Sequence, residues 1–275
     1  MLINGIFEGG GIKGLAYVGV MRFLEERGFQ FQFVGGTSIG ALFSSLIATG
    51  YNSYEIEDLI KNFDLNILTP QKKEKKIAKI ISGFKEKGLY SIKPFEEYLE
   101  NLFLLKNKTI FRDVKLGNNY LLKVIVTDLK NRKKIILPDD LKQYGYSPDG
   151  FKIAKAVAMS ASLPLVFTPY TIGENTFVDG GVVNNFPITL FSQSLIPTLG
   201  FRLNADSKLT NFLNKYRSKV FKTECNYDFE KYNIISINTS DYKAADFKKG
   251  LENFQQLFLL GYNSMKEYFY QKFKC

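Results

Sequence analysis

The 275-residue chain contains no histidine and no tryptophan. Histidine is the commonest general base in enzymes, so its absence excludes every Ser-His-Asp triad. It also excludes a metal site made of cysteine and histidine. The two cysteines, Cys225 and Cys275, are too few for a disulfide framework, so nothing in the sequence indicates an oxidising compartment.

Long apolar segments and acidic clusters are also missing. No apolar run reaches the ~18 residues of a membrane-spanning helix, and the first residues, MLINGIF, lack the basic region and long apolar stretch of a signal peptide. We therefore expect a cytoplasmic protein that can act peripherally at a membrane. Because no acidic cluster suggests a calcium-binding loop, we expect no metal and no cofactor, and an activity that resists chelators.

Basic residues are in excess, with 37 Lys and Arg against 27 Asp and Glu, which gives a net charge of +10. This charge favours anionic partners such as phospholipid head groups, nucleic acid or acidic substrates, although lysine is also frequent on many soluble surfaces. The sequence has no RNA-reading motif and no aromatic–basic alternation typical of single-strand binding. A nucleic-acid partner is therefore not expected, and a membrane surface is.

Two strand–turn–helix units follow one another within the first fifty residues. Each predicted strand, over 2–7 and 31–34, runs into a glycine-rich turn and then an apolar helix, over 12–27 and 41–49. This alternation predicts an α/β fold with a central, mostly parallel sheet. Further strands are predicted over 120–127, 134–137, 177–178, 196–201 and 234–237, and further helices over 53–63, 151–160, 208–220 and 245–269. Without repeats or a linker, the chain is predicted to be a single domain.

A lysine-rich segment covers residues 70–87. Its apolar residues fall at helical spacing, which predicts a basic amphipathic helix with Ile77, Ile80, Ile81 and Phe84 on one face. The flanking lysines are Lys72, Lys73, Lys75, Lys76 and Lys79. Two interpretations remain open: a surface helix that packs on the core, or an interfacial helix or lid that contacts anionic lipid.

A G-x-S-x-G pattern, Gly36 to Gly40, lies between a predicted strand and a predicted helix. In this context the serine of the motif occupies a sharp turn that exposes its hydroxyl, and the helix N-terminus favours developing negative charge. The pattern predicts that Ser38 is a nucleophile. The alternative is a glycine-rich turn in which the serine only caps the helix.

A nucleophilic serine needs a base, and without histidine the candidates are a carboxylate or a lysine held neutral. Asp179 is the best placed, because it ends a predicted strand in a glycine turn and is expected at the same sheet edge as Ser38. The alternative is that Asp179 only makes the hydrogen bond of an Asx turn, a common use of Asp-Gly.

The glycines that follow the first predicted strand match the spacing of a dinucleotide-binding loop, Gly9-x-Gly11-x-x-Gly14. That function also needs an acidic residue at the end of the second strand, and FQFVGG has none. Backbone N–H groups of Gly10 and Gly11 could instead stabilise the oxyanion of an acyl-transfer reaction. Lys13 could hold charge nearby or pair with a lipid phosphate.

Taken together, these motifs resemble those of the patatin-like phospholipases. The similar segments are GGGIKG (9–14), GTSIG (36–40), VIVTDL (124–129), AMSASLPLVFTP (158–169) and DGGVVNNFP (179–187). The resemblance covers about residues 4–190, and the three glycine motifs in this order are more specific than any one alone. Residues 191–275 show no similar motif and are expected to pack on the rest.

The resemblance implies a single α/β domain that hydrolyses fatty-acyl esters of phospholipids, lysophospholipids or neutral glycerides. It implies that Ser38 is the nucleophile and Asp179 the base, with Gly10 and Gly11 in the oxyanion hole. Lys13 would be the basic residue of the glycine motif. The structural supports implied behind the aspartate are Asn184, Asn185 and Pro187. An acyltransferase with the same site, or a non-catalytic basic membrane-binding protein, remains possible from the sequence.

Overall fold

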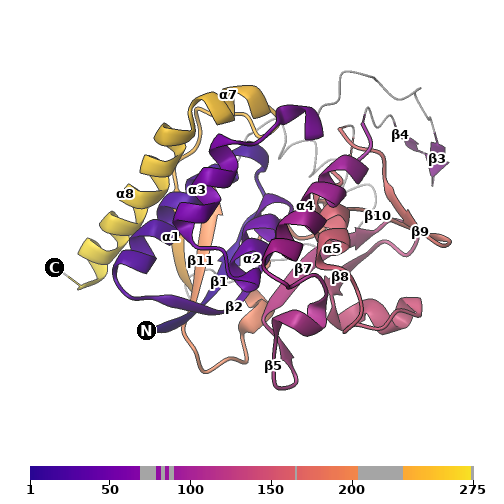
Figure 1. Ribbon diagram of the computed structural model, residues 1–275, viewed down its shortest axis with the longest axis horizontal. Coiled ribbons are helices and arrows are strands. Elements are labelled where there is room, and N and C mark those ends of the chain that lie inside the picture. Colours follow the sequence, from indigo (N-terminus) through magenta and orange to yellow (C-terminus); the bar gives the residue numbers. More distant parts are fainter. Residues whose placement is uncertain (69–78, 82–83, 87–89, 165, 204–231, 274–275) are drawn as a thin grey trace.

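The computed structural model describes residues 1–68, 79–81, 84–86, 90–164, 166–203 and 232–273 (Figure 1). Its central sheet consists of β1 (Leu2–Phe7), β2 (Gln30–Thr37), β7 (Leu122–Asp128), β8 (Lys133–Leu137), β9 (Tyr170–Ile172), β10 (Asn175–Asp179), β11 (Thr198–Leu203) and β12 (Asn233–Ile237). The strand order is β12-β11-β1-β2-β7-β10-β9, and β8 also pairs with β7. The short strands β5 (Lys115–Leu116) and β6 (Asn119–Tyr120) form a separate hairpin.

In the order β12-β11-β1-β2-β7, each strand pairs parallel with the next. Strands β8 and β10 pair antiparallel with β7, and β9 pairs antiparallel with β10. The predicted α/β class with a mostly parallel sheet is therefore confirmed. The centre of the sheet is deeply buried: Val124, Ile125 and Val126 of β7 have no exposed surface. A strand covered on both faces requires such an unbroken apolar run, which explains the sequence VIV.

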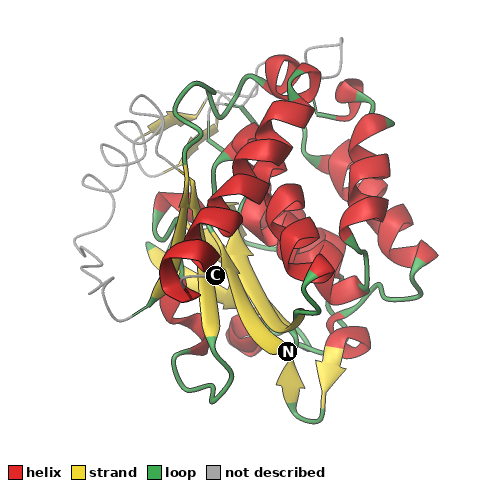
Figure 2. Cartoon of the chain, turned by 90° about the vertical axis from the view of Figure 1, so that its left-hand side faces the viewer, coloured by secondary structure: helices red, strands yellow, loops and turns green. Residues whose placement is uncertain are grey.

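The helices are α1 (Tyr17–Glu26), α2 (Ile39–Thr49), α3 (Ser53–Lys61), α4 (Lys93–Leu105), α5 (Ile153–Ala161), α7 (Phe247–Glu252) and α8 (Phe254–Phe273). Figure 2 shows much of this helical layer against one side of the strands. The start of α3 follows from a capping box: the Asn52 side chain accepts from the Glu55 amide, and the Glu55 carboxylate accepts from the Asn52 amide. Because this pairing is local, it can be predicted from the sequence.

Two predicted helices are divided in the structure, and a third is not tested. The first, over 12–27, is a 3-10 helix, η1 (Gly11–Ala16), followed by α1. The helix predicted over 245–269 is divided at Asn253 into α7 and α8. The helix predicted over 208–220 lies outside the described residues.

The prediction of a basic helix over residues 70–87 is wrong where the structure describes this segment. Residues Lys79–Ile81 form β3 and Phe84–Glu86 form β4, and the two strands pair antiparallel with Ile80 opposite Lys85. Isoleucine and phenylalanine favour strands, and only two residues separate the pair, a spacing typical of a hairpin. Apolar residues at helical spacing over so short a run do not distinguish the two structures. Lys72, Lys73, Lys75 and Lys76 lie outside the described residues.

Candidate active site

Ser38 lies in the sharp turn that joins β2 to α2. Its backbone has φ 55° and ψ −122°, a conformation that costs a residue with a side chain on the order of 1–3 kcal/mol. The turn is tight because β1 passes directly beside it: a Cβ added to Gly40 would lie 2.1 Å from the carbonyl oxygen of Phe7. Glycine is therefore required there.

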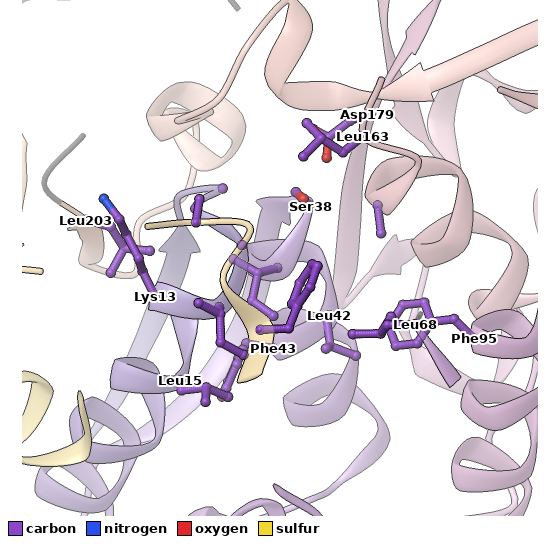
Figure 3. Close-up of a pocket in the computed structure, with 18 of the residues that line it drawn as sticks. Lys13, Leu15, Ser38, Leu42, Phe43, Leu68, Phe95, Leu163, Asp179 and Leu203 are labelled. Atoms are coloured by element: carbon purple, nitrogen blue, oxygen red, sulfur yellow. The ribbon is translucent and has the colours of Figure 1, made fainter. Parts of the chain in front are cut away.

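The Ser38 hydroxyl does not cap α2, although Ser38 occupies the N-cap position. The alternative that this serine is only a helix cap is therefore wrong. The side chain instead lines a cavity that Asp179 also lines. Figure 3 shows the Ser38 hydroxyl on the side of the cavity that faces Asp179.

Strand register brings Asp179 to this position. Thr37, the residue before Ser38, is paired with Ile125 of β7, and Asp179 is paired with Val126 on the same strand. Because β10 runs antiparallel to β7, Asp179 arrives from the direction opposite to that of the parallel strands. The predicted proximity of Ser38 and Asp179 thus arises through the central strand β7, not through a shared parallel direction.

The carboxylate of Asp179 is almost fully buried, with 2% of the residue exposed. Its Oδ1 atom accepts a hydrogen bond of 2.7 Å from the Gly181 amide, which is the Asx turn expected of an Asp-Gly pair. Its Oδ2 atom has no hydrogen-bond partner among the described residues. One oxygen therefore stabilises the turn while the other stays available.

Burial raises the pKa of Asp179 to about 6, and the Ser38 hydroxyl and the Gly181 amide oppose this rise by favouring the charged form. The Ser38 hydroxyl therefore lies near the carboxylate but makes no hydrogen bond to Oδ2. Such contacts are often long before substrate binds. A carboxylate with this pKa is mostly ionised at neutral pH and can accept a proton.

The glycine loop after β1 reaches the same cavity. The Gly9 amide donates to the Asn185 carbonyl at 3.0 Å, and the Ile12 amide donates to the Ala244 carbonyl at 2.9 Å. The Gly10 and Gly11 amides between them donate to no acceptor in the described part of the chain. Gly11 has φ +56°, and a Cβ there would lie 2.1 Å from the Ala244 oxygen, so the loop requires glycine.

The predicted supports behind Asp179 connect its turn to the other two motifs. The Asn185 side chain donates to the Gly9 carbonyl at 2.9 Å. The Asn184 carbonyl accepts from the Thr37 hydroxyl at 2.9 Å. Pro187 precedes the short 3-10 helix Ile188–Phe191. The turn of Asp179 is thus fastened to the glycine loop and to the strand that ends at Ser38.

Lys13 lies apart from Ser38 and Asp179, toward Leu203 (Figure 3). Only 1% of Lys13 is exposed. Burial raises the pKa of the neighbouring Glu8 to about 7, and the Lys13 charge is one of several groups that oppose this rise. The structure therefore places Lys13 in the cavity wall but beside a carboxyl group that sequence reasoning missed. A glutamate at the end of a buried strand, directly before the glycines, is the signal that could have identified Glu8.

The cavity has a volume of about 370 Å³. Its polar lining includes Glu8, Lys13, Ser38 and Asp179 together with the glycine loop. The apolar lining contributed by α2, α3 and α4, which we call the apolar arm, consists of Leu42, Phe43, Leu46, Ile56, Leu59, Ile60, Phe95, Tyr98, Leu99 and Leu102. In Figure 3, Leu42 and Phe95 lie below Ser38, whereas Asp179 lies above it.

Comparison with known proteins agrees with this architecture. Residues 5–192 match the family described as Patatin-like phospholipase, and the chain belongs to that family. It is 38% identical to the uncharacterized protein YqhO of Bacillus subtilis over 267 residues, 90% of this chain and 91% of YqhO. It is 26% identical to the probable lipid hydrolase 463L of invertebrate iridescent virus 6, over 90% of this chain and 82% of that protein.

A solved structure shares the fold. VipD from Legionella pneumophila superposes with a TM-score of 0.59 at 17% sequence identity. The match covers 97% of this chain and 66% of VipD, so the chain spans slightly less than two thirds of that protein. Family membership and the viral relative together support a lipid hydrolase role. None of the described helices combines the length and hydrophobicity needed to cross a membrane.

Proposed function

We propose that this protein hydrolyses fatty-acyl esters of phospholipids or lysophospholipids, with Ser38 as nucleophile and Asp179 as general base. The observation that carries the proposal is the uncommitted Oδ2 atom of the buried Asp179 carboxylate, which lies in the same cavity as the strained Ser38. A carboxylate with a pKa of about 6 has the affinity to take a proton at neutral pH.

In this mechanism Ser38 Oγ attacks the acyl carbonyl while Asp179 takes the hydroxyl proton. The amides of Gly10 and Gly11 donate to the oxyanion, and each such donor typically contributes on the order of 10²–10³ to the rate. The tetrahedral intermediate collapses to an acyl-serine as Asp179 returns the proton to the leaving alcohol. Water, deprotonated by the same carboxylate, then attacks the acyl group, and the fatty acid leaves as Ser38 regains its proton.

The apolar arm supports a fatty-acyl substrate. An alkyl chain gains about 0.8 kcal/mol for each CH₂ group removed from water, and this arm begins beside Ser38 and is lined mainly by aliphatic and aromatic side chains. A small polar ester would leave most of the arm unused. The arrangement of a polar end and an apolar arm therefore suits an ester whose acyl part is long.

The proposal also includes binding of the protein to an anionic membrane surface. We expect the +10 chain to be attracted to anionic lipid, with the lysines of residues 72–79 contributing about 1 kcal/mol each near such a surface. Vesicle flotation at low and high salt tests this attraction. Binding that is absent, or that does not weaken with salt, would remove this part.

Lipid profiling tests the proposed reaction. Wild-type protein and the Ser38→Ala variant are incubated with mixed phospholipids, and free fatty acids and lysolipids are measured. The wild type should release both products, and the variant should release neither while keeping the same melting temperature within a few degrees. Product formation by Ser38→Ala, or none by the wild type, would contradict the proposal. Added glycerol separates hydrolysis from acyl transfer, because a transferase would form acylglycerol.

A further inference from the structure

A buried hydroxyl holds the backbone of the strained Ser38 in place. The Ser38 amide donates a hydrogen bond of 2.8 Å to Oγ of Ser160, a residue near the C-terminal end of α5. Ser160 is completely buried, and its hydroxyl in turn donates to the carbonyl oxygen of Ile125 at 2.7 Å. The Ser160 hydroxyl therefore accepts one hydrogen bond and donates another, and in this way connects Ser38 to the central strand β7.

The carbonyl to which Ser160 is bound is also a packing surface for the aspartate turn. A Cβ added to Gly180, the residue after Asp179, would lie 2.3 Å from the Ile125 oxygen. The same end of α5 contacts the aspartate directly, since the Asp179 amide donates to the Ser162 carbonyl at 3.0 Å. The end of α5 is thus hydrogen-bonded to both site residues, through Ser160 to the Ser38 amide and through the Ser162 carbonyl to the Asp179 amide.

We propose that Ser160 is a positioning residue that fixes the distance between the Ser38 hydroxyl and the Asp179 carboxylate by bridging the Ser38 amide and the Ile125 carbonyl. The inference rests on the proposed function of Ser38 and Asp179. A residue in a costly backbone conformation keeps it only where its surroundings impose it. Besides the helical bond from the Leu42 amide to the Ser38 carbonyl, the Ser160 bridge is the hydrogen bond that holds the Ser38 backbone within the described residues.

Removing the Ser160 hydroxyl should therefore let the turn relax without changing the cavity that binds substrate. A misplacement of about 1 Å in reacting groups can cost on the order of 10²-fold in rate. We expect Ser160→Ala to lower kcat by roughly 10- to 100-fold while KM for a fatty-acyl ester stays within about twofold, because uniform binding to the apolar arm is unchanged.

The matched control is Ser45→Ala. Ser45 is also completely buried, but its hydroxyl donates only to the Leu42 carbonyl within α2, and it does not line the cavity. A general loss of buried hydrogen bonding would affect the two variants alike. A positioning role would slow Ser160→Ala alone. Ser160→Thr keeps a hydroxyl at this position and should recover part of the rate, as expected for a bridging oxygen.

The test measures the rate of covalent labelling by a fluorophosphonate, with melting temperatures recorded for every variant. The wild type should be labelled and Ser38→Ala should not. Ser160→Ala should be labelled at least tenfold more slowly than Ser45→Ala when both are assayed well below their melting temperatures. Equal labelling rates for these two variants would overturn the inference while leaving the proposed function intact. An unlabelled wild type would instead overturn the proposed function.

Discussion

Two buried carboxyl groups, Asp179 and Glu8, line the same cavity but are bonded in different ways. Burial raises the pKa of Asp179 to about 6 and that of Glu8 to about 7. The Oε2 atom of Glu8 accepts from the Leu203 backbone amide at 2.7 Å, and its Oε1 atom accepts from the side-chain Nδ2 of Asn185 at 3.4 Å. Asp179 has a partner for Oδ1 only, among the described residues.

The difference separates two uses of a buried carboxyl group. Glu8 joins the glycine loop to β11 and to the turn that carries Asn185, so both of its oxygens hold the fold together. Asp179 keeps one oxygen, Oδ2, without a hydrogen-bond partner among the described residues, in the cavity that Ser38 also lines. A raised pKa alone would make Glu8 as good a candidate base as Asp179, and only the bonding pattern distinguishes them.

The largest expected effect is on turnover. Asp179→Asn should lower kcat for a fatty-acyl ester by about 10²- to 10⁴-fold, because an amide cannot accept the Ser38 proton. Glu8→Gln keeps an oxygen that can accept from the Leu203 amide and should change kcat by less than about tenfold, the effect of a shifted loop. Steady-state kinetics of the two variants give the comparison. A larger loss in Glu8→Gln than in Asp179→Asn would reverse the roles assigned here.

The next effect is on substrate choice and tests whether the apolar arm and the polar end of the cavity have different roles. Leu42→Trp places a larger side chain in the arm beside Ser38, and we expect a loss of roughly 10- to 100-fold in kcat/KM for a long-chain ester. A butyryl ester does not need the full arm and should be affected only a few-fold. Asp179→Asn should reduce both esters equally. Equal losses for both esters in Leu42→Trp would mean that the arm does not hold the acyl chain.

A smaller effect concerns stability and pH. Because the folded-state pKa of each carboxyl group is raised, its contribution to stability is fully present below the unfolded pKa and is lost as pH rises through the folded one. For Asp179 this stability is lost between pH 3.8 and about pH 6, and for Glu8 it is lost between pH 4.5 and about pH 7. At about 1.4 kcal/mol per pH unit, each amounts to about 3 kcal/mol.

Denaturant unfolding of wild type, Asp179→Asn and Glu8→Gln from pH 4 to pH 8 measures this contribution. The difference in unfolding free energy between Asp179→Asn and the wild type should grow in favour of the variant up to pH 6 and then stay constant. The corresponding difference for Glu8→Gln should continue to change up to pH 7. A difference for Asp179→Asn that does not vary with pH would show that its carboxyl group titrates normally in the folded protein.

Local patterns in the sequence were sufficient to predict much of the fold and the residues that meet in the cavity. The strand–turn–helix units around the glycine loop and Ser38 depend on neighbouring residues, as does the capping box at Asn52, and the structure contains each of them. The prediction of a basic helix over residues 70–87 failed because the spacing of apolar residues in a short segment does not decide between a helix and a hairpin. The choice also depends on whether two strands can pair, as β3 and β4 do.

The partners of the site residues could not be predicted in the same way. Ser160 reaches Ser38 across 122 positions of sequence, and Glu8 reaches Leu203 across 195. Serines near helix ends are common, so Ser160 has no distinctive local pattern. The position of Glu8 directly before the glycines is a local signal, but it does not identify Leu203 as the partner of Glu8. The sequence predicted that Asp179 and Ser38 lie at the same sheet edge, but not that the antiparallel strand β10 brings Asp179 there through its register on β7. Register between distant strands depends on the whole sheet.

The most direct test of the central claim is the detection of an acyl group on Ser38 itself. Wild-type protein is mixed with a long-chain fatty-acyl ester and quenched in acid within the first turnover. The peptide that contains Ser38 is then examined by mass spectrometry. We expect a peptide heavier by one fatty-acyl group in the wild type and an unmodified peptide in Ser38→Ala. Ester hydrolysis with the acyl group on a different residue, or on no residue at all, would contradict the role of Ser38 as nucleophile.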